Sequence, residues 1–346
     1  MHGEYKPGEK LPGEKLLAKE LGVSLVTLRA ALAMLQHAGI VNCIDRSGNY
    51  VAENLDSHKK YLAVVTGDDF ENISVACMYY INELQKNLAV TGDRLKIILS
   101  TQLEKKFTEN KWHSRLAKDN ISGIFLCEGG YNGNEKSLNL LRSANLPVVQ
   151  LAGVPSDREL YDFPILLRYS SETFSSGVKY LISLGHKKIA TLFPQNGCMR
   201  GFTPETYKDF LTKAGIPEAN SLVCYFKKKN QLASIIRKLM IQPSPPTAFM
   251  CYCDATAMYA LETLDEMGYD VPEQISVMGI CGYTERLFTL KPLSVVNFHY
   301  DISASEAVKL MNDSASWYGK KQNITQIIPH EIIARSTTAV CSENIK

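Results

Sequence analysis

The spacing of apolar and polar positions divides the chain into two unlike parts. Residues 14–21 and 24–38 carry apolar side chains at helical spacing, and residues 40–44 and 49–53 are two short strand-like runs. From residue 61 onward, apolar runs of strand length alternate with amphipathic stretches of helix length. This pattern predicts a small unit of two helices and a hairpin, followed by a much larger α/β region.

Turn and cap residues set the bounds of the two N-terminal helices. Gly22 suits the C-terminal end of the first, and the hydroxyl of Ser24 suits the N-cap of the second. The second helix is expected to bury one stripe, made of Leu28, Ala31, Leu32 and Leu35. The side chains expected on its open face, near its N-terminal end, are Leu25, Val26, Thr27, Arg29 and Ala30.

The tip of the predicted hairpin consists of Asp45, Arg46, Ser47 and Gly48. Two short helices followed by a hairpin are the layout of a winged helix-turn-helix, in which the second helix enters the DNA major groove. A helix pair with a hairpin can also be a packing or dimerisation module. Charge does not decide between these, because residues 1–53 hold six Lys/Arg and six Asp/Glu, and the whole chain of 346 residues has a net charge of only +2.

The larger region predicts a doubly wound α/β fold. Its strands are expected at residues 62–66, 95–100, 124–127, 148–151, 189–193, 222–225, 248–251 and 276–280. Its helices are expected at residues 74–88, 135–144, 172–184, 204–214, 231–240 and 254–267. Such alternation predicts parallel sheets, and its length suggests two lobes. Ligands of open α/β sheets bind at the carboxyl ends of the strands.

Several classes of chemistry find no support in the sequence. The nine cysteines, at 43, 77, 127, 198, 224, 251, 253, 281 and 341, form no CxxC pair, and we expect buried, reduced thiols rather than a metal or redox site. No HExxH, GxSxG or phosphate-binding loop is present, so neither an enzyme nor a cofactor is expected. His186, in a turn between a helix and a strand, is expected to be structural. No apolar run has the length of a membrane span, and a cytoplasmic protein is expected.

The N-terminal region resembles the GntR family of bacterial regulators. The matching segments are residues 5–12 (YKPGEKLP), 17–24 (LAKELGVS), 27–32 (TLRAAL) and 39–41 (GIV). The resemblance implies that the chain binds double-stranded operator DNA. The DNA-contacting residues that it implies are Lys15, Ser24, Leu25, Val26, Thr27, Arg29, Arg46, Ser47 and Gly48.

Three departures from the family pattern concern DNA binding. The family usually has arginine where this chain has Leu25 and Lys15, and arginine makes a planar two-pronged contact that neither residue can make. The family domain also begins with a helix upstream of the Tyr5 segment. We therefore expect either a true start further upstream or a weakened DNA-binding domain.

The larger region resembles the effector domain of LacI/GalR regulators, a relative of periplasmic binding proteins. Residues 181–190, 246–249, 268–279 and 328–337 carry the resemblance. With the GntR-like start, the architecture is similar to that of the arabinose repressor type. The expected division is a DNA-binding domain at 1–53, a linker at 54–60 and an effector-binding, dimerising domain at 61–340. Its first lobe would comprise residues 61–166 and 297–327, and its second 167–296 and 328–340.

A sugar site needs paired hydrogen-bonding groups and an aromatic face. Candidates at the strand ends are Asp68, Asp69, Phe70, Glu128, Tyr131, Tyr169, Glu172, Arg200, Phe202, Asp254, Cys281 and Tyr283. The pattern departs from the family where Cys281 replaces an aspartate, Cys253 precedes Asp254, Arg168 or Tyr169 stands for an acidic residue, and Arg200 has altered spacing. The effector is therefore a carbohydrate or an atypical ligand, unless the domain responds to none.

The combined expectation is a homodimeric transcriptional regulator, more often a repressor than an activator, whose affinity for operator DNA is controlled by a small-molecule effector. The alternative is a solute-binding or sensor protein with a weakened or non-functional DNA-binding domain. The sequence identifies neither the operator nor the effector.

Overall fold

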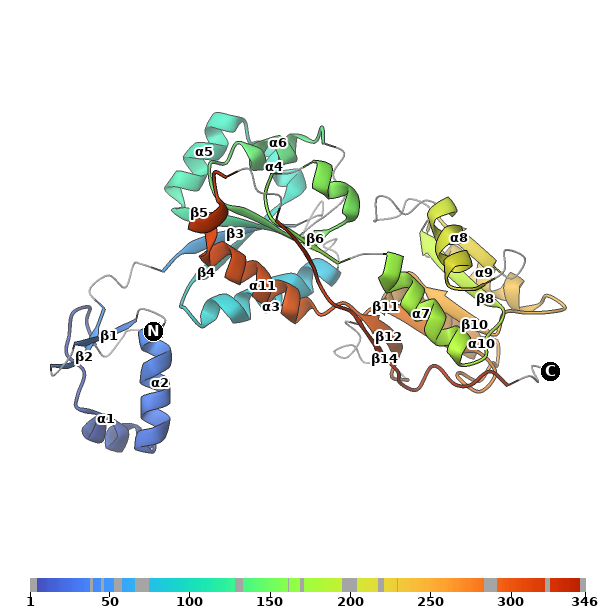
Figure 1. The fold of residues 1–346 in the computed structure, drawn as a ribbon, viewed down its shortest axis with the longest axis horizontal. Coiled ribbons are helices and arrows are strands. Elements are labelled where there is room, and N and C mark those ends of the chain that lie inside the picture. Colours follow the sequence, from blue (N-terminus) through green and yellow to red (C-terminus); the bar gives the residue numbers. More distant parts are fainter. Residues whose placement is uncertain are drawn as a thin grey trace.

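The protein consists of a small N-terminal domain and two lobes, each built on a mainly parallel sheet (Figure 1). The computed structural model describes residues 5–37, 40–44, 47–52, 58–65, 75–127, 133–160, 162–168, 171–194, 204–216, 221–228, 230–282, 291–320 and 324–342. The two-lobed α/β fold predicted from the sequence is confirmed, and so are the N-terminal helices and hairpin.

The N-terminal domain comprises α1 (Glu14–Leu21), α2 (Leu25–His37), β1 (Val41–Ile44) and β2 (Gly48–Val51). Gly22 ends α1 in the left-handed conformation, with a φ of 66°. Ser24 precedes α2, and its Oγ accepts the backbone N–H of Thr27 at 3.1 Å. β1 and β2 pair antiparallel, with Val41 opposite Val51 and Ile44 opposite Gly48. Both predicted caps are confirmed.

The core of this domain is smaller than the predicted stripe. Leu28 and Leu32 of α2 are buried against Leu17 and Ala18 of α1, with Leu11 and Leu25 packed beside them. Ala31 is exposed and Leu35 is 37% exposed, so the predicted burial of these two residues is wrong. The single helix α1 covers a narrower strip of α2 than the full i to i+7 stripe.

The first lobe has a six-stranded sheet in the order β13-β7-β6-β5-β3-β4. The strands are β3 (Lys60–Val65), β4 (Arg94–Leu99), β5 (Ile121–Leu126), β6 (Val148–Gly153), β7 (Ile165–Leu167) and β13 (Thr325–Ile327). Alternate β3 residues point to opposite faces. On one face, Ala63 packs in a hydrophobic cluster with the helices α3 (Val75–Ala89) and α11 (Tyr300–Asn312). On the other face, Val64 belongs to a hydrophobic cluster with three helices, α4 (Ser100–Lys106), α5 (Glu109–Lys118) and α6 (Lys136–Arg142).

The second lobe repeats this plan with the strand order β14-β12-β11-β10-β8-β9. The strands are β8 (Ile189–Pro194), β9 (Ser221–Phe226), β10 (Ala248–Cys251), β11 (Ser276–Cys281), β12 (Ser294–Asn297) and β14 (Glu331–Ile333), the last antiparallel to β12. Helices α7 (Ser171–Ser183) and α8 (Pro204–Lys213) pack in one cluster. Helices α9 (Gln231–Met240) and α10 (Asp254–Glu266) pack in the other.

The chain passes between the lobes three times. It leaves β7 for α7, returns from β12 to α11, and leaves β13 for β14. The first and third passages are joined, because the Ile328 N–H donates to the Leu167 carbonyl at 2.9 Å. The sequence did not predict β7, α4, α5 or the elements from β12 onward, including the short α12 (Ser314–Trp317) and the 3-10 helix at Pro155–Glu159.

The cysteines are less uniformly buried than expected. Cys77, Cys127, Cys251 and Cys281 are buried, and all described cysteines are free. Cys43 is exposed, and Cys224, Cys253 and Cys341 are partly exposed, so the expectation of burial is wrong for these four. Cys43 lies in a hairpin strand where only Val41 is buried. Among the described residues, no cluster of three or more His, Cys, Asp or Glu has a metal-binding arrangement.

The described helices include none with the length and apolar character needed to cross a bilayer.

His186 has the structural role predicted for it. Its Nδ1 lies 3.0 Å from Thr247 Oγ1, and its Nε2 lies 3.0 Å from Ser276 Oγ and 3.1 Å from the Ala339 carbonyl. These contacts join the turn before β8 to the starts of β10 and β11 and to the C-terminal segment. Burial lowers the pKa of His186, and the hydrogen bond to Ala339 opposes that effect.

The lowered pKa of His186 predicts a loss of stability in mild acid. Below its usual value near 6.5, the unfolded chain binds a proton that the folded protein excludes, so stability is complete above that pH and falls as the pH drops. We expect H186Q to lower the unfolding free energy at pH 7.5 and to flatten its dependence between pH 7.5 and 5.5. Urea denaturation of the full chain measures both effects. A pH dependence as steep as that of the wild type would contradict the prediction.

Candidate functional site

The exposed end of α2 and the hairpin form the first candidate site. Val26, Thr27 and Arg29 of α2 are exposed, as is Lys15 of α1. Leu25 is only partly exposed and packs against the core of the domain, so it contributes less to this face than expected. Arg46 lies outside the described residues.

An ion pair connects the two helices at this face. The Nε of Arg29 lies 2.7 Å from Glu14 Oε2, and both side chains are solvent-exposed. Exposed pairs of this kind contribute about 0–1 kcal/mol, so DNA phosphates could compete for the arginine. The pair nevertheless sets the direction of the Arg29 side chain, toward α1.

The hairpin tip is held by residues upstream of α1. Gly48 has a φ of +112°, a conformation that favours glycine. Ser47 Oγ lies 2.7 Å from the Tyr50 hydroxyl, and the ammonium of Lys10 lies 5.6 Å from the centre of the Tyr50 ring. The Leu11 N–H donates to the Asn49 carbonyl at 2.8 Å. The sequence did not predict this support, because neither periodicity nor turn chemistry identifies a partner for a single short segment.

The second candidate site lies where the carboxyl ends of the two sheets meet. Of the predicted effector residues, the structure describes Asp254 and Cys281, and it describes Glu172 only as part of the α7 backbone. The others lie outside the described residues: Asp68, Asp69, Phe70, Glu128, Tyr131, Tyr169, Arg200, Phe202 and Tyr283. For those positions, and for the Glu172 side chain, the sequence-based assignment stays a prediction.

Asp254 and Cys281 stand at the ends of adjacent parallel strands. Asp254 is the first residue of α10, just beyond β10, and Cys281 is the last residue of β11. Both are buried. Gly279 allows this close packing, because a Cβ there would lie 2.8 Å from Asp254 Oδ1 and 3.3 Å from its Cα.

Arg168 occupies the passage from β7 to α7 and contacts both of its aromatic neighbours from the first lobe. Arg168 is 8% exposed, and its Nη1 lies 3.4 Å from the Tyr300 hydroxyl and 3.5 Å from the Tyr80 hydroxyl. The guanidinium carbon lies 5.2 Å from the centre of the Phe298 ring and 5.6–5.7 Å from the two tyrosine rings. A buried cation is thus surrounded by aromatic faces and hydroxyls.

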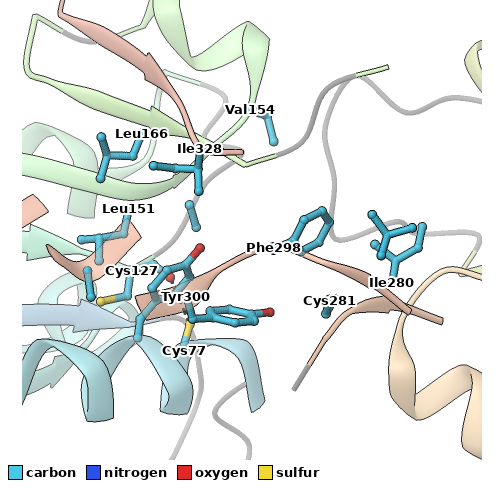
Figure 2. Packing of buried hydrophobic residues seen from close by; sticks show 14 of the residues in the cluster. Cys77, Cys127, Leu151, Val154, Leu166, Ile280, Cys281, Phe298, Tyr300 and Ile328 are labelled. Atoms are coloured by element: carbon cyan, nitrogen blue, oxygen red, sulfur yellow. Dashed lines mark hydrogen bonds between the residues drawn. The ribbon is translucent and has the colours of Figure 1, made fainter. Parts of the chain in front are cut away.

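Figure 2 shows that the packing at this site continues from one lobe to the other. Phe298 lies on the passage between Cys281 and Tyr300, with Cys77 and Cys127 beyond Tyr300. The Phe298 N–H donates to the Cys281 carbonyl at 3.2 Å, and the Cys77 thiol donates to the Cys127 carbonyl at 3.1 Å. We call Arg168, Phe298, Tyr80, Tyr300 and Cys281 the inter-lobe cluster.

Burial determines the protonation of this cluster. The pKa of the Cys281 thiol is raised well above its usual value by burial and by the nearby Asp254 charge, while Arg168 and a hydrogen bond with Tyr300 oppose the rise. Burial also raises the pKa of Tyr80, against the opposing effect of Arg168. Cys281 therefore remains a neutral thiol. The cluster offers one cation, aromatic faces and neutral hydroxyl and thiol groups, which suit binding better than nucleophilic catalysis.

Sequence reasoning missed most of the inter-lobe cluster. Tyr80, Phe298 and Tyr300 were not among the candidates, and Arg168 was noted only as a departure from a family pattern. Tyr80 and Tyr300 belong to helices of the first lobe that pack side by side, and no linear motif joins them to Arg168. An arginine directly after a buried strand is the one signal that could have indicated this site.

Comparison with known families assigns both domains. Residues 1–51 match the family described as bacterial regulatory proteins, gntR family, and residues 178–338 match the periplasmic binding protein-like domain. The chain joins a GntR-type helix-turn-helix to a periplasmic-binding-protein-like body. The family resemblances drawn from the sequence are therefore confirmed.

Curated relatives align with much of this chain. An HTH-type transcriptional repressor PurR from Histophilus somni is 29% identical over 64% of this chain, and the match spans 66% of that relative's length. The arabinose metabolism transcriptional repressor of Geobacillus stearothermophilus is 26% identical over 82% of this chain and 78% of its own length. Homologues of this chain, which joins a GntR-type domain to a periplasmic-binding-protein-like body, are thus transcriptional repressors.

Solved structures support the fold. The lac repressor dimer bound to operator and the anti-inducer ONPF superposes with a TM-score of 0.62, at 17% identity, over 82% of this chain and 94% of the other. A LacI-family regulator from Rhizobium etli gives a TM-score of 0.65 at 16% identity, over 81% and 99% of the two chains. At this identity the likeness concerns the fold alone.

The inter-lobe cluster predicts that Arg168 stabilises the body. In R168M the tyrosine hydroxyls and the Phe298 ring lose their cation, and we expect the unfolding free energy to fall by roughly 2 kcal/mol. R168K should restore only part of this, because a compact ammonium cannot contact both hydroxyls and the ring at once. Urea denaturation measures the effect, with R158M, at an exposed position of the first lobe, as control. Equal stability of R168M and R158M would argue against this role.

Proposed function

We propose that the protein is a bacterial transcriptional regulator that binds double-stranded operator DNA through α2 and the hairpin. The observation that carries the proposal is an exposed N-terminal end of α2, in a GntR-type domain, joined to a body whose two parallel sheets meet at their carboxyl ends. In winged helix-turn-helix proteins that end of the second helix enters the major groove. The repressor functions of the relatives support the same conclusion.

The proposed DNA contacts follow from exposure. Val26, Thr27 and Arg29 would face the base edges, and Lys15 would face a phosphate. Ser24, at the N-cap, lies beside them, and Arg46, Ser47 and Gly48 would form the wing. Leu25 has a mainly structural part in this proposal, because it packs against the core of the domain.

The proposed assembly is a cytoplasmic homodimer that represses transcription. Two copies would place two α2 helices on the half-sites of a pseudo-palindrome, as the two-fold symmetry of such dimers requires. Residues 61–340 would supply both the dimer contact and the effector site. Residues 54–60 would be the linker, and the lobe boundaries would lie at the three passages between the sheets.

The proposed effector is a small molecule held between the lobes, near Asp254, Cys281 and Arg168. A carbohydrate fits the buried carboxylate and the aromatic rings. The thiol of Cys281, in contrast, is a weak hydrogen-bonding group. Sugars and phosphorylated sugars are therefore the first compounds to test, and the phosphorylated ones would use the charge of Arg168.

A second function is favoured by the Arg29–Glu14 ion pair and by the balanced charge of the N-terminal domain. With six basic and six acidic side chains in residues 1–53, phosphate attraction is weak. The protein would then be a solute-binding sensor whose DNA-binding domain is weakened or non-functional. DNA selection separates the two functions.

Selection of the full chain against a library of random duplexes should enrich an inverted repeat. We expect K15A to weaken binding to all sequences, because a phosphate contact carries no sequence information. The slope of the logarithm of the binding constant against the logarithm of the salt concentration should fall by about one. R29A should weaken binding to the selected sequence more than binding to random DNA. K179A, in the body, is the control. Enrichment of no sequence would support the sensor function instead.

Effector binding should raise the melting temperature of the full chain. We expect one sugar or phosphosugar in a panel to do so, because a ligand of the native state stabilises it. D254N should remove the shift, since it replaces the buried carboxylate with an isosteric amide. D265N, on the exposed face of the same helix, should keep it. A shift of the same size in D254N would contradict the proposed location of the site.

A further inference from the structure

Apart from Arg29, the exposed side chains in the first two turns of α2 that follow the N-cap are Val26, Thr27 and Ala30, and each of them carries a methyl group. We propose that Val26 is a specificity-determining residue that contacts the 5-methyl group of a thymine in the operator half-site. This inference deepens the proposed DNA-binding function and rests on it.

Val26 is unusual among the apolar side chains of the protein. It is 79% exposed, more than any other large apolar side chain in the described part of the chain. It lies in the first turn of α2, two residues after Ser24, the N-cap. An apolar side chain so exposed, at the end of a helix that enters the major groove, is positioned to bury its surface on binding DNA.

The polar groups beside Val26 are already engaged. The Thr27 hydroxyl lies 2.8 Å from Ser24 Oγ, and the same Oγ accepts the Thr27 backbone N–H at 3.1 Å. Because the Thr27 hydroxyl contacts the cap residue Ser24, the methyl group of Thr27 is also available to contact DNA. Arg29 is directed toward Glu14 of α1 by a contact of 2.7 Å. Ala30, in the next turn, is exposed and adds a further methyl group.

The chemistry of the major groove identifies the matching base. Guanine, cytosine and adenine present hydrogen-bond donors and acceptors there, and thymine alone presents a methyl group. A valine set against guanine or cytosine would leave their polar edges without partners, which is unfavourable. Because phosphate contacts carry no sequence information, a contact of this kind with a base would contribute directly to the sequence preference.

The test replaces single thymines by uracil, which removes only the methyl group and keeps the base pair. The full chain is bound to the selected duplex, and each half-site thymine is changed in turn. For the wild type we expect one or two positions at which uracil weakens binding roughly three- to tenfold. In V26A, uracil at those positions should weaken binding less than twofold, because the isopropyl group is gone.

Two further variants keep the test interpretable. V26T retains one γ-methyl group and should retain part of the discrimination between thymine and uracil. Val90 is exposed on the body, and V90A should behave as the wild type. V26A should fold normally, since the site is exposed and alanine favours helix; an unchanged melting temperature confirms this.

Equal sensitivity to uracil in V26A and the wild type would overturn the inference, and so would a selected half-site without thymine dependence. In both cases DNA binding itself would stand. Enrichment of no duplex would instead contradict the proposed function, and the inference with it.

Discussion

The fold of the body depends on one constraint: two parallel sheets share a chain that crosses between them three times, and their carboxyl ends therefore meet. Arg168 lies on the first passage and Phe298 on the second, and the guanidinium is 5.2 Å from the phenyl ring. Hydrogen bonds of Arg168 to Tyr80 and Tyr300 bring helices α3 and α11 into the same contact. Any change in the relative position of the lobes must rearrange this cluster.

Helix α3 connects the inter-lobe cluster to β3, the first strand of the body after the N-terminal domain. The segment after β2 leads into β3, the strand that pairs with both β4 and β5 in the first lobe. α3 follows β3 in the chain and supplies Tyr80 to the cluster. A ligand that altered the contacts of Arg168 would act on elements next to the point where the N-terminal domain is attached. A coupling of about 1–3 kcal/mol between the two sites would give 5- to 150-fold regulation.

Periodicity and caps predicted the parts of the structure that local chemistry determines. The bounds of α1, the cap at Ser24 and, apart from β7, α4 and α5, the alternation of strands and helices from β3 to β11 follow from spacing, turns and propensity. Contacts distant in sequence were not predicted. The exposure of Leu35 depends on which helix covers α2, and the inter-lobe cluster joins residues 80, 168, 281, 298 and 300 through topology alone. Short strands such as β7 and β13 carry too few residues for a period to be recognised.

The affinity of the full chain for its selected operator, measured with and without a compound that raises its melting temperature, tests whether the body controls the DNA-binding domain. We expect a saturating concentration of the compound to change the dissociation constant at least fivefold, because the two sites would share one conformational equilibrium. We expect a much smaller change in R168M, where the inter-lobe cluster is broken. A compound that stabilises the body yet leaves operator affinity unchanged would contradict control of the DNA-binding domain by the body.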